Sequence, residues 1–415
     1  MPNLYTKMEK EKIKVVWLCH FSNAEIQAIL KPFKKVNEYA PWIPMALKVL
    51  ENDSRLDIYI LAPHEYICGI HRFDIRGIHY IFYNAHMPLI GRHWPGFFKW
   101  DYMSNFFTNK LITRYLIKKI KPDIIHLHGA ENAYFSSTIL PLIKKHPSIL
   151  TIQGFISHAS SLHSKQLKKR VAIEQKIIQS IPVAFYRTKK MADDIKQINP
   201  NVFLFWNTYA SLSIEHELKQ VNKKYDMVFF ARVSKDKGIF DLLQAVAILK
   251  EKYPTIRVCV IGSGSIEECK QYAIELGIAE NVHWAGFLPT QKDVHQLAVQ
   301  AKISVLPTYF DIIPGTIIES MFLGIPVVSY YTDSIPEINE KEEVISLVEK
   351  GNVHALAKAM QELLDNPELR KERSLKGRKR AKEMFVFEDE IIIQSLLKGY
   401  KHSINLFNKD NKKII

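Results

Sequence analysis

Two carboxylates stand on either side of a Pro-Gly pair in the segment 309–320, which reads YFDIIPGTIIES. Asp311 precedes the pair and Glu319 follows it, with seven residues between them. An apolar run ends just before the segment, and we expect Pro314 and Gly315 in the first turn of a helix that runs to about Leu323. The amides that begin this helix, at Gly315 and Thr316, would then face the same pocket as the two acids. Such a pocket suits a ligand with phosphate and hydroxyl groups, as in a nucleotide sugar; alternatively, Asp311 only balances the positive end of the helix.

Two cations follow another predicted strand, at residues 227–230. The next eight residues, 231–238, read ARVSKDKG and place Arg232 and Lys237 after that strand and just before a helix. A helix N-terminus attracts anions, and an Arg fork with a Lys charge beside it suits a diphosphate. The alternative, which the spacing alone slightly favours, is two solvated loop cations.

Glycines end two further predicted strands. Gly262 and Gly264 form a Gly-x-Gly turn after the strand at 257–261, where they allow a tight turn and close backbone approach. The pair lacks the third glycine of a dinucleotide fingerprint. Gly286 follows the strand at 282–284, and its loop could hold a nucleotide base through backbone groups, although a plain turn fits equally well.

Short apolar runs alternate with helical segments along the chain. Many runs are rich in Val and Ile and lack polar alternation, which is typical of parallel strands buried on both faces. The predicted strands are residues 13–19, 56–61, 78–83, 123–127, 148–152, 183–186, 202–206, 227–230, 257–261, 282–284, 303–306, 326–329 and 344–347. The polar segment 207–224 separates two such series. We therefore expect an α/β protein with two Rossmann-like, doubly wound domains that face each other across a cleft.

The expected boundaries follow from this division. Residues 1–210 should form the first domain, residues 211–386 the second, and residues 387–415 a C-terminal helix that packs back on the first. Ligands of open parallel sheets bind outside the carboxyl ends of the strands, so the loops that follow strands should carry the site.

The composition is that of an ordinary globular protein with surplus positive charge. The 415 residues are 47% hydrophobic and 24% charged, and the net charge of +14 suggests an anionic partner. Four scattered cysteines form no CxxC pair and no zinc-ligand spacing occurs, so we expect neither a disulfide framework nor a metal site. Without a secretory core or a run of about 18 apolar residues, we expect a cytoplasmic protein.

The second half resembles the retaining GT-B glycosyltransferases of the family-4 type, the glycosyl transferases group 1. Four motifs occur in the family's order within residues 225–340: ARVSKDKG, GSG, VHWAG and DIIPGTIIESMFLGIPVVS. The resemblance implies that Arg232 and Lys237 hold the donor diphosphate and stabilise the leaving group. It also implies that Glu319 binds the ribose hydroxyls and that Asp311 binds hydroxyls of the transferred sugar.

The remaining donor-site candidates are glycines and one threonine of the same motifs: Gly262, Gly264, Gly286, Gly315 and Thr316. Two departures from the family occur. Asp311 is one methylene shorter than the usual Glu, and Pro314 replaces a glycine and removes one backbone donor. The resemblance implies a nucleotide-sugar co-substrate, retention of anomeric configuration, no other cofactor and no catalytic metal.

The first half resembles the family less strongly. Residues 121–129 read KPDIIHLHG, similar to a family segment that places His128 near the donor sugar, so we count it among the catalytic candidates. Gln153 stands where many relatives have a histidine, and it could bind substrate but not titrate. A loop with His20 replaces the usual glycine-rich turn. His20, Gly129 and Gln153 are the acceptor-side candidates, while a packed structural histidine is the alternative for His128.

Residues 82–107 combine many aromatic rings with several cations. Such a stretch could engage a lipid-linked acceptor at an anionic membrane surface, or it could be aromatic core packing around a loop.

We expect a glycosyltransferase that acts on a saccharide or lipid-linked acceptor in bacterial surface polysaccharide or lipopolysaccharide assembly, peripheral on the inner face of the membrane. The alternatives are a GT-B epimerase or phosphorylase, and a non-catalytic basic protein that binds nucleic acid or membrane. No known nucleic-acid-binding pattern occurs, which disfavours nucleic acid.

Overall fold

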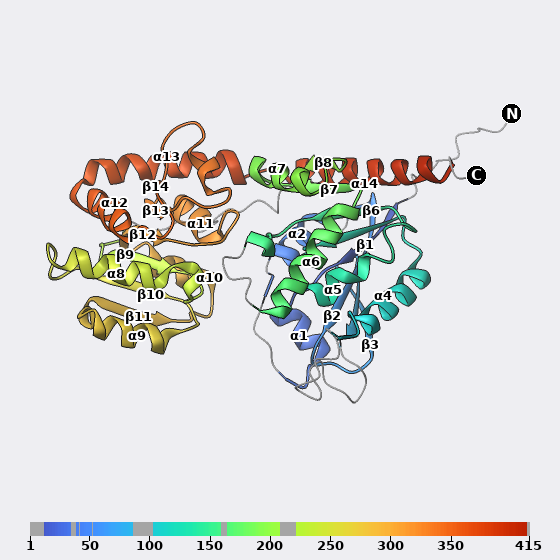
Figure 1. The fold of residues 1–415 in the computed structure, drawn as a ribbon, viewed down its shortest axis with the longest axis horizontal. Coiled ribbons are helices and arrows are strands. Elements are labelled where there is room, and N and C mark those ends of the chain that lie inside the picture. Colours follow the sequence, from blue (N-terminus) through green and yellow to red (C-terminus); the bar gives the residue numbers. More distant parts are fainter. Residues whose placement is uncertain are drawn as a thin grey trace. The chain divides into compact units, whose positions relative to one another are not determined.

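The computed structural model describes residues 12–34, 39–40, 42–51, 53–85, 103–158, 164–207 and 221–412 of the chain (Figure 1). The chain is divided into two compact units. The N-terminal unit comprises Met1–Arg187, Met191–Ala210 and Phe387–Ile415, and the C-terminal unit comprises Thr188–Lys190 and Ser211–Val386. Two ranges lie outside the described residues. Residues 86–102 make up most of the aromatic and cationic stretch 82–107, and residues 208–220 make up most of the polar segment 207–224.

An eight-stranded sheet forms the centre of the N-terminal unit, in the order β3-β4-β2-β1-β5-β6-β7-β8. Its strands are β1 (Ile13–Leu18), β2 (Leu56–His64), β3 (Ile70–Ile75), β4 (Ile78–Asn84), β5 (Ile124–His128), β6 (Ser148–Thr151), β7 (Val183–Tyr186) and β8 (Phe203–Trp206). The predicted strands of this half are confirmed. The edge strand β3 was not predicted; it pairs antiparallel with β4, and its side chains alternate between exposed and half-buried.

Helices accompany this sheet (Figure 1). They are α1 (Ala24–Leu30), α2 (Trp42–Leu50), α4 (Phe107–Ile120), α5 (Ala133–Ser136), α6 (Lys165–Ser180), α7 (Lys189–Ile198) and α14 (Asp389–Lys412). The last helix, α14, belongs to the N-terminal unit although it ends the chain. Its fully buried Tyr400 hydroxyl accepts from Trp17 Nε1 at 3.0 Å and lies 2.8 Å from His126 Nδ1. A hydrogen-bonded core contact therefore joins the two ends of the sequence.

A six-stranded parallel sheet forms the centre of the C-terminal unit, in the order β11-β10-β9-β12-β13-β14. Its strands are β9 (Tyr225–Phe230), β10 (Val258–Ile261), β11 (Val282–Gly286), β12 (Ala301–Leu306), β13 (Val327–Tyr330) and β14 (Ser346–Val348). Its helices are α8 (Ile239–Lys250), α9 (Ile266–Glu275), α10 (Gln291–Ala298), α11 (Gly315–Leu323), α12 (Val353–Asp365) and α13 (Pro367–Phe385). Each predicted strand of this half is again confirmed.

The strand order decides which loops meet. β9 lies between β10 and β12, so the loops that follow these three strands share one edge of the sheet. In the N-terminal unit β5 lies between β1 and β6, so the loops after β1, β5 and β6 share an edge in the same way. Within the described ranges, no helix combines the length and apolar character that crossing a membrane requires.

Candidate active site

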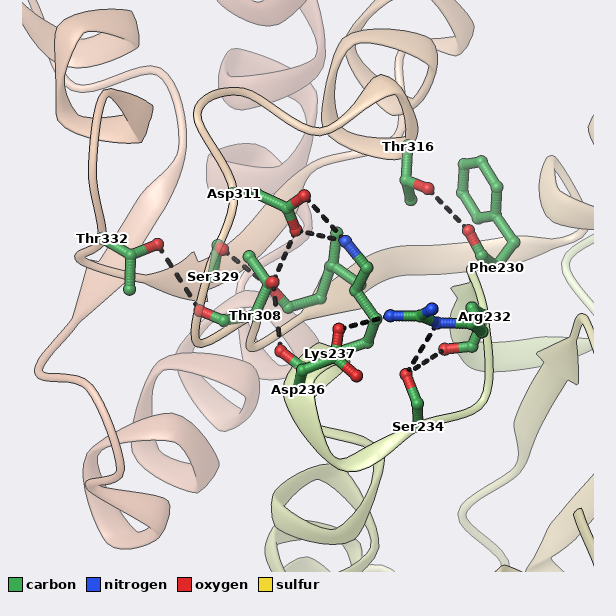
Figure 2. A network of polar contacts seen from close by, with 11 residues as sticks. Phe230, Arg232, Ser234, Asp236, Lys237, Thr308, Asp311, Thr316, Ser329 and Thr332 are labelled. Carbon is green, nitrogen blue, oxygen red and sulfur yellow. Dashed lines mark hydrogen bonds and ion pairs between the residues drawn. The ribbon is translucent and has the colours of Figure 1, made fainter. Parts of the chain in front are cut away.

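The loop between β9 and α8 carries the two predicted cations (Figure 2). Arg232 is 64% exposed; its Nη2 lies 2.6 Å from Asp236 Oδ2, and its Nε donates to Ser234 Oγ at 3.2 Å. Burial alone would raise the pKa of Asp236, but the Ser234 hydroxyl and the Arg232 charge together lower it. A guanidinium has five N–H donors, so Arg232 is oriented by its neighbours and keeps donors for a ligand.

Lys237 ends the same loop and forms an ion pair with Asp311, 74 residues away in sequence (Figure 2). Its Nζ lies 2.7 Å from Asp311 Oδ1 and 2.5 Å from Oδ2, and the two side chains are 19% and 20% exposed. Thr308, just after β12, donates its hydroxyl to Asp311 Oδ2 at 2.6 Å. An ammonium has three N–H donors, so the pair leaves at least one for a phosphate oxygen.

Helix α11 begins beside this ion pair. Pro314, expected in the first turn, is instead the N-cap residue, with φ −68° and extended backbone. Thr316 donates its hydroxyl to the carbonyl oxygen of Phe230 at 2.6 Å, which ties the helix start to the end of β9 (Figure 2). The Thr316 side chain is therefore used in structure. Its amide and that of Gly315 belong to the first turn, which has no partners within the helix and favours an anion.

Glu319 lies one turn further along α11. Its Oε2 accepts from Gln291 Nε2 at 2.5 Å and lies 3.1 Å from His295 Nε2, both on α10. Its Oε1 is 3.6 Å from the position a Cβ on Gly315 would take, so this oxygen is directed at the helix start. Sequence reasoning missed Gln291 and His295; the signal was their i,i+4 spacing on one helix face.

Close backbone packing explains the Gly-x-Gly turn. Gly262 and Gly264 have φ values of 140° and 142°, and a Cβ at either would lie within 2.1 Å of the carbonyl oxygens of Ala231 and Val233, respectively. Val233 also donates to the carbonyl of Ser263 at 2.9 Å. The turn therefore packs directly against the backbone on both sides of Arg232. This is the close backbone approach that the two glycines were expected to allow.

The loop after β12 is held by a second carboxylate. Tyr309 donates its backbone amide to the carbonyl of Asp236 at 2.9 Å and its hydroxyl to Asp241 Oδ2 at 2.6 Å. Burial and the Asp241 carboxylate raise the pKa of Tyr309 to about 12. The loops that carry Lys237 and Asp311 are thus joined by backbone and side-chain contacts. Gly286, the remaining donor-site candidate, accepts at its carbonyl from the Gly262 amide at 2.8 Å.

The candidates of the N-terminal unit lie at the carboxyl ends of its central strands. His20, His128 and Gln153 line one cavity of about 170 Å³. His128 is buried, and burial lowers its pKa to about 3, so the imidazole is neutral. Gly129 has φ 92°, and a Cβ there would lie 2.7 Å from Glu131 Oε2, so this glycine leaves room for the Glu131 side chain. Sequence reasoning missed Glu131, which also lines the cavity.

Two sets of predicted residues are therefore brought together, one in each unit. Arg232, Lys237, Asp311 and the start of α11 meet at one edge of the C-terminal sheet (Figure 2). His20, His128 and Gln153 meet in the N-terminal cavity. Among the residues that the structure describes, no group of three or more His, Cys, Asp or Glu side chains is arranged to hold a metal ion.

Known families match the unit that carries the cations and acids. Residues 213–380 match the model described as glycosyl transferases group 1. The chain is 28% identical over 292 residues to an uncharacterized glycosyltransferase of Haemophilus influenzae, across 68% of this chain and 77% of that protein. It is 26% identical over 194 residues to the capsular polysaccharide biosynthesis glycosyltransferase CapM of Staphylococcus aureus, across 47% and 49%.

Solved structures agree on the fold. Sucrose-phosphate synthase from Thermosynechococcus elongatus superposes with a TM-score of 0.71 at 15% identity, over 94% of this chain and 99% of that one. HepE from Anabaena in complex with UDP-glucose superposes with a TM-score of 0.64 at 14% identity, over 93% and 98%. The expected GT-B fold of two parallel-sheet domains is confirmed, and together with the domain and the relatives it supports a glycosyltransferase.

Proposed function

We propose that this protein transfers a sugar, with retention of anomeric configuration, from a nucleotide-sugar donor to a saccharide or lipid-linked acceptor. The main observation behind this proposal is the Lys237–Asp311 ion pair beside Arg232 and the start of α11. Two oriented cations and a helix N-terminus at one sheet edge suit a diphosphate. The UDP-glucose bound to HepE supports a nucleotide-sugar donor.

The donor's charged part would lie on the loop after β9. Arg232 and Lys237 would hold the diphosphate oxygens, and the amides of Gly315 and Thr316 would add backbone donors. Glu319, oriented through its Oε2 by Gln291 and His295, would accept from a ribose hydroxyl with Oε1. The resemblance to family-4 enzymes supports these roles.

The same groups would act in the transfer step. The bond between the sugar's anomeric carbon and the diphosphate oxygen breaks, and the acceptor oxygen bonds to that carbon. The acceptor proton passes to the departing diphosphate, whose added negative charge Lys237 and Arg232 stabilise without a metal. Preorganised cations and dipoles of this kind supply a large share of catalysis in transfer reactions. Asp311, near the ammonium, would bind hydroxyls of the transferred sugar and hold Lys237 in place.

Ligand-dependent melting tests the donor site. We expect UDP, GDP or ADP, alone or as a sugar conjugate, to raise the melting temperature of the wild-type protein. Lys237→Ala and Arg232→Ala should lose that stabilisation and the transferase activity. Lys235→Ala, which removes an exposed cation from the same turn, is the matched control and should keep both.

Two results would contradict this function. One is unchanged diphosphate binding in both site variants, and the other is a folded wild-type protein that none of the nucleotides stabilises. Retention is tested separately by the NMR coupling constant of the product's anomeric proton. An inverted product would overturn retention while leaving the donor site intact.

An anionic membrane surface is the proposed setting of the acceptor. Helix α4 exposes Phe107, Leu111 and Tyr115, which recur every four residues and are 57%, 48% and 53% exposed. The exposed cations Arg114 and Lys118 lie along the same helix, and the helix contains no acidic residue. An apolar stripe bordered by cations suits the interface of a bilayer that contains anionic lipid. The CapM relative supports a role in polysaccharide assembly.

A further inference from the structure

Asp241 lies in the first turn of α8 and binds two tyrosines through one oxygen atom. Its Oδ2 accepts from the Tyr309 hydroxyl at 2.6 Å and from the Tyr330 hydroxyl at 2.5 Å. The two rings lie edge to face, with their centroids 5.4 Å apart. Hydrogen bonds from a hydroxyl to a carboxylate are shorter and stronger than those between neutral groups. Three segments of the C-terminal unit, α8, the loop after β12 and the end of β13, therefore meet at one carboxylate.

The loop after β12 connects this carboxylate to the candidate active site. Tyr309 directly follows Thr308 and precedes Asp311 by two residues. The Thr308 hydroxyl donates to Asp311 Oδ2 at 2.6 Å, and Asp311 in turn holds the Lys237 ammonium (Figure 2). A shift of Tyr309 would therefore move the segment that carries both Thr308 and Asp311.

The turn that carries Lys237 packs tightly against the same loop. Tyr309 donates its backbone amide to the carbonyl of Asp236 at 2.9 Å. Gly238, with φ 74°, lies so close to the loop that a Cβ there would be 2.0 Å from the carbonyl oxygen of Pro307. Closely packed interiors are hardly compressible, so a small displacement in one segment is transmitted to its neighbour. The geometry of the two loops is therefore set jointly.

Tyr330 offers an internal comparison. It is fully buried and ends β13, where it pairs with Val348 of β14 in the parallel ladder. Its backbone is thus fixed by the sheet, whereas Tyr309 lies in a loop outside the strands. Losing either phenol oxygen removes one hydrogen bond to the same Asp241 oxygen. Only the loss at Tyr309 loosens the segment that carries Asp311.

We propose that Asp241 and Tyr309 are positioning residues for the sugar moiety of the donor. Through the Tyr309 hydroxyl, Asp241 holds the loop after β12 in place. Asp311 can then meet the sugar hydroxyls while it orients Lys237. This inference rests on the proposed function, which gives Asp311 its contact with the sugar. Neither positioning residue belongs to the four family motifs.

The inference concerns the sugar and not the nucleotide. A free nucleoside diphosphate has no sugar to position, so it serves as the reference ligand for the corresponding nucleotide sugar. The affinity of the nucleotide sugar divided by that of the free nucleoside diphosphate should therefore depend on the Asp241–Tyr309 bond.

Calorimetric titration of the full chain measures this ratio. The probes are UDP-glucose, UDP-N-acetylglucosamine, GDP-mannose and ADP-glucose, each beside its free nucleoside diphosphate, and the pair that the wild type binds best is used. Tyr309→Phe should lower the ratio at least about fivefold, because a hydrogen bond to a charged group is worth about ten- to hundredfold in affinity. Tyr330→Phe, the matched control, should leave the ratio unchanged although it lowers the melting temperature by a similar amount.

Variants of Asp241 test the same contact from its other partner. Asp241→Asn keeps an acceptor oxygen and should retain the wild-type ratio, whereas Asp241→Ala should lower it as Tyr309→Phe does. Combining Asp241→Ala with Tyr309→Phe should lower the ratio no further, because both changes remove one interaction. Asp241→Ala also replaces Tyr309→Phe as the test if the latter does not fold.

Two results would overturn the inference while leaving the donor site intact. In the first, Tyr309→Phe keeps the wild-type ratio. In the second, Tyr330→Phe lowers the ratio as much as Tyr309→Phe does, so that the contact only supports the fold. Failure of the proposed function is distinguishable, because the folded wild-type protein would then bind none of the nucleotides, and that result would overturn this inference as well.

Discussion

Replacing Glu131 by glutamine should change how the stability of the N-terminal unit depends on pH. The Oε2 atom of Glu131 is buried without a partner among the described atoms, and burial raises its pKa from 4.5 to about 7. The folded state therefore binds this proton more tightly than the unfolded state does. The resulting stabilisation is complete below pH 4.5 and is lost as the pH rises through 7. Glutamine has the same shape and does not ionise.

The magnitude follows from the two pKa values. A difference between 4.5 and about 7 corresponds to about 3.4 kcal/mol at the high-pH limit, at 1.36 kcal/mol per pH unit. Integration between pH 5 and pH 8 gives a loss of about 2.5 kcal/mol from the wild type that Glu131→Gln does not suffer. Glu131 keeps part of its solvent contact, which reduces the expected change to about 1.5–2.5 kcal/mol.

Urea unfolding of both proteins at pH 5, 6, 7 and 8 measures this change. Hydrogen exchange of peptides from β5 and β6 reports it locally in the same unit. The stability of Glu131→Gln minus that of the wild type should become more positive with rising pH. Glu362→Gln, which alters an exposed carboxylate of the C-terminal unit, should run parallel to the wild type. If Glu131→Gln also runs parallel, Glu131 ionises alike in the folded and unfolded states, and the reasoning from its burial is wrong.

Two further predictions concern packing and the surface. Gly264→Ala should lower the free energy of unfolding of the C-terminal unit by about 2 kcal/mol or more, because its φ is 142° and the new Cβ would meet the Val233 carbonyl. Denaturant titration measures this, and Ser263→Ala, an exposed neighbour, should be neutral; equal stability of the two variants would contradict the close approach. Leu111→Ser should weaken co-flotation with phosphatidylglycerol vesicles about five- to thirtyfold, because a partly buried leucine contributes about 1–2 kcal/mol. Leu375→Ser, at another exposed leucine, is the control, and wild-type protein that does not float would refute the membrane contact.

Local pattern was sufficient to locate the strands. Runs such as 227–230 and 258–261 are apolar without alternation because parallel strands bury both faces, and that property can be read without knowing the neighbours. The edge strand at 70–75 escaped because its side chains are exposed or half-buried, so its composition resembles that of a loop. Pro314 and Gly315 predicted the start of α11, although Pro314 caps the helix and does not lie in its first turn.

Motif spacing also placed Arg232, Lys237, Asp311 and Glu319 in loops and a helix at strand ends, where the structure has them. It could not predict what each side chain touches. The Glu319 partner His295 and the cavity residue Glu131 lie outside the motifs that identified the other site residues. His295 offered only its i,i+4 spacing from Gln291, and Glu131 lies two residues beyond Gly129.

The sequence by itself therefore determined the order of elements, the family motifs and the strand ends at which polar groups stand. The tertiary structure decided the Lys237–Asp311 pair across 74 residues, the burial of Glu131, and the joining of His20, His128 and Gln153 into one cavity. The physical reason is the strand order. Crossover connections place β12 beside β9 and β5 beside β1, and hydrogen bonding and desolvation depend on such spatial neighbours rather than on neighbours along the chain.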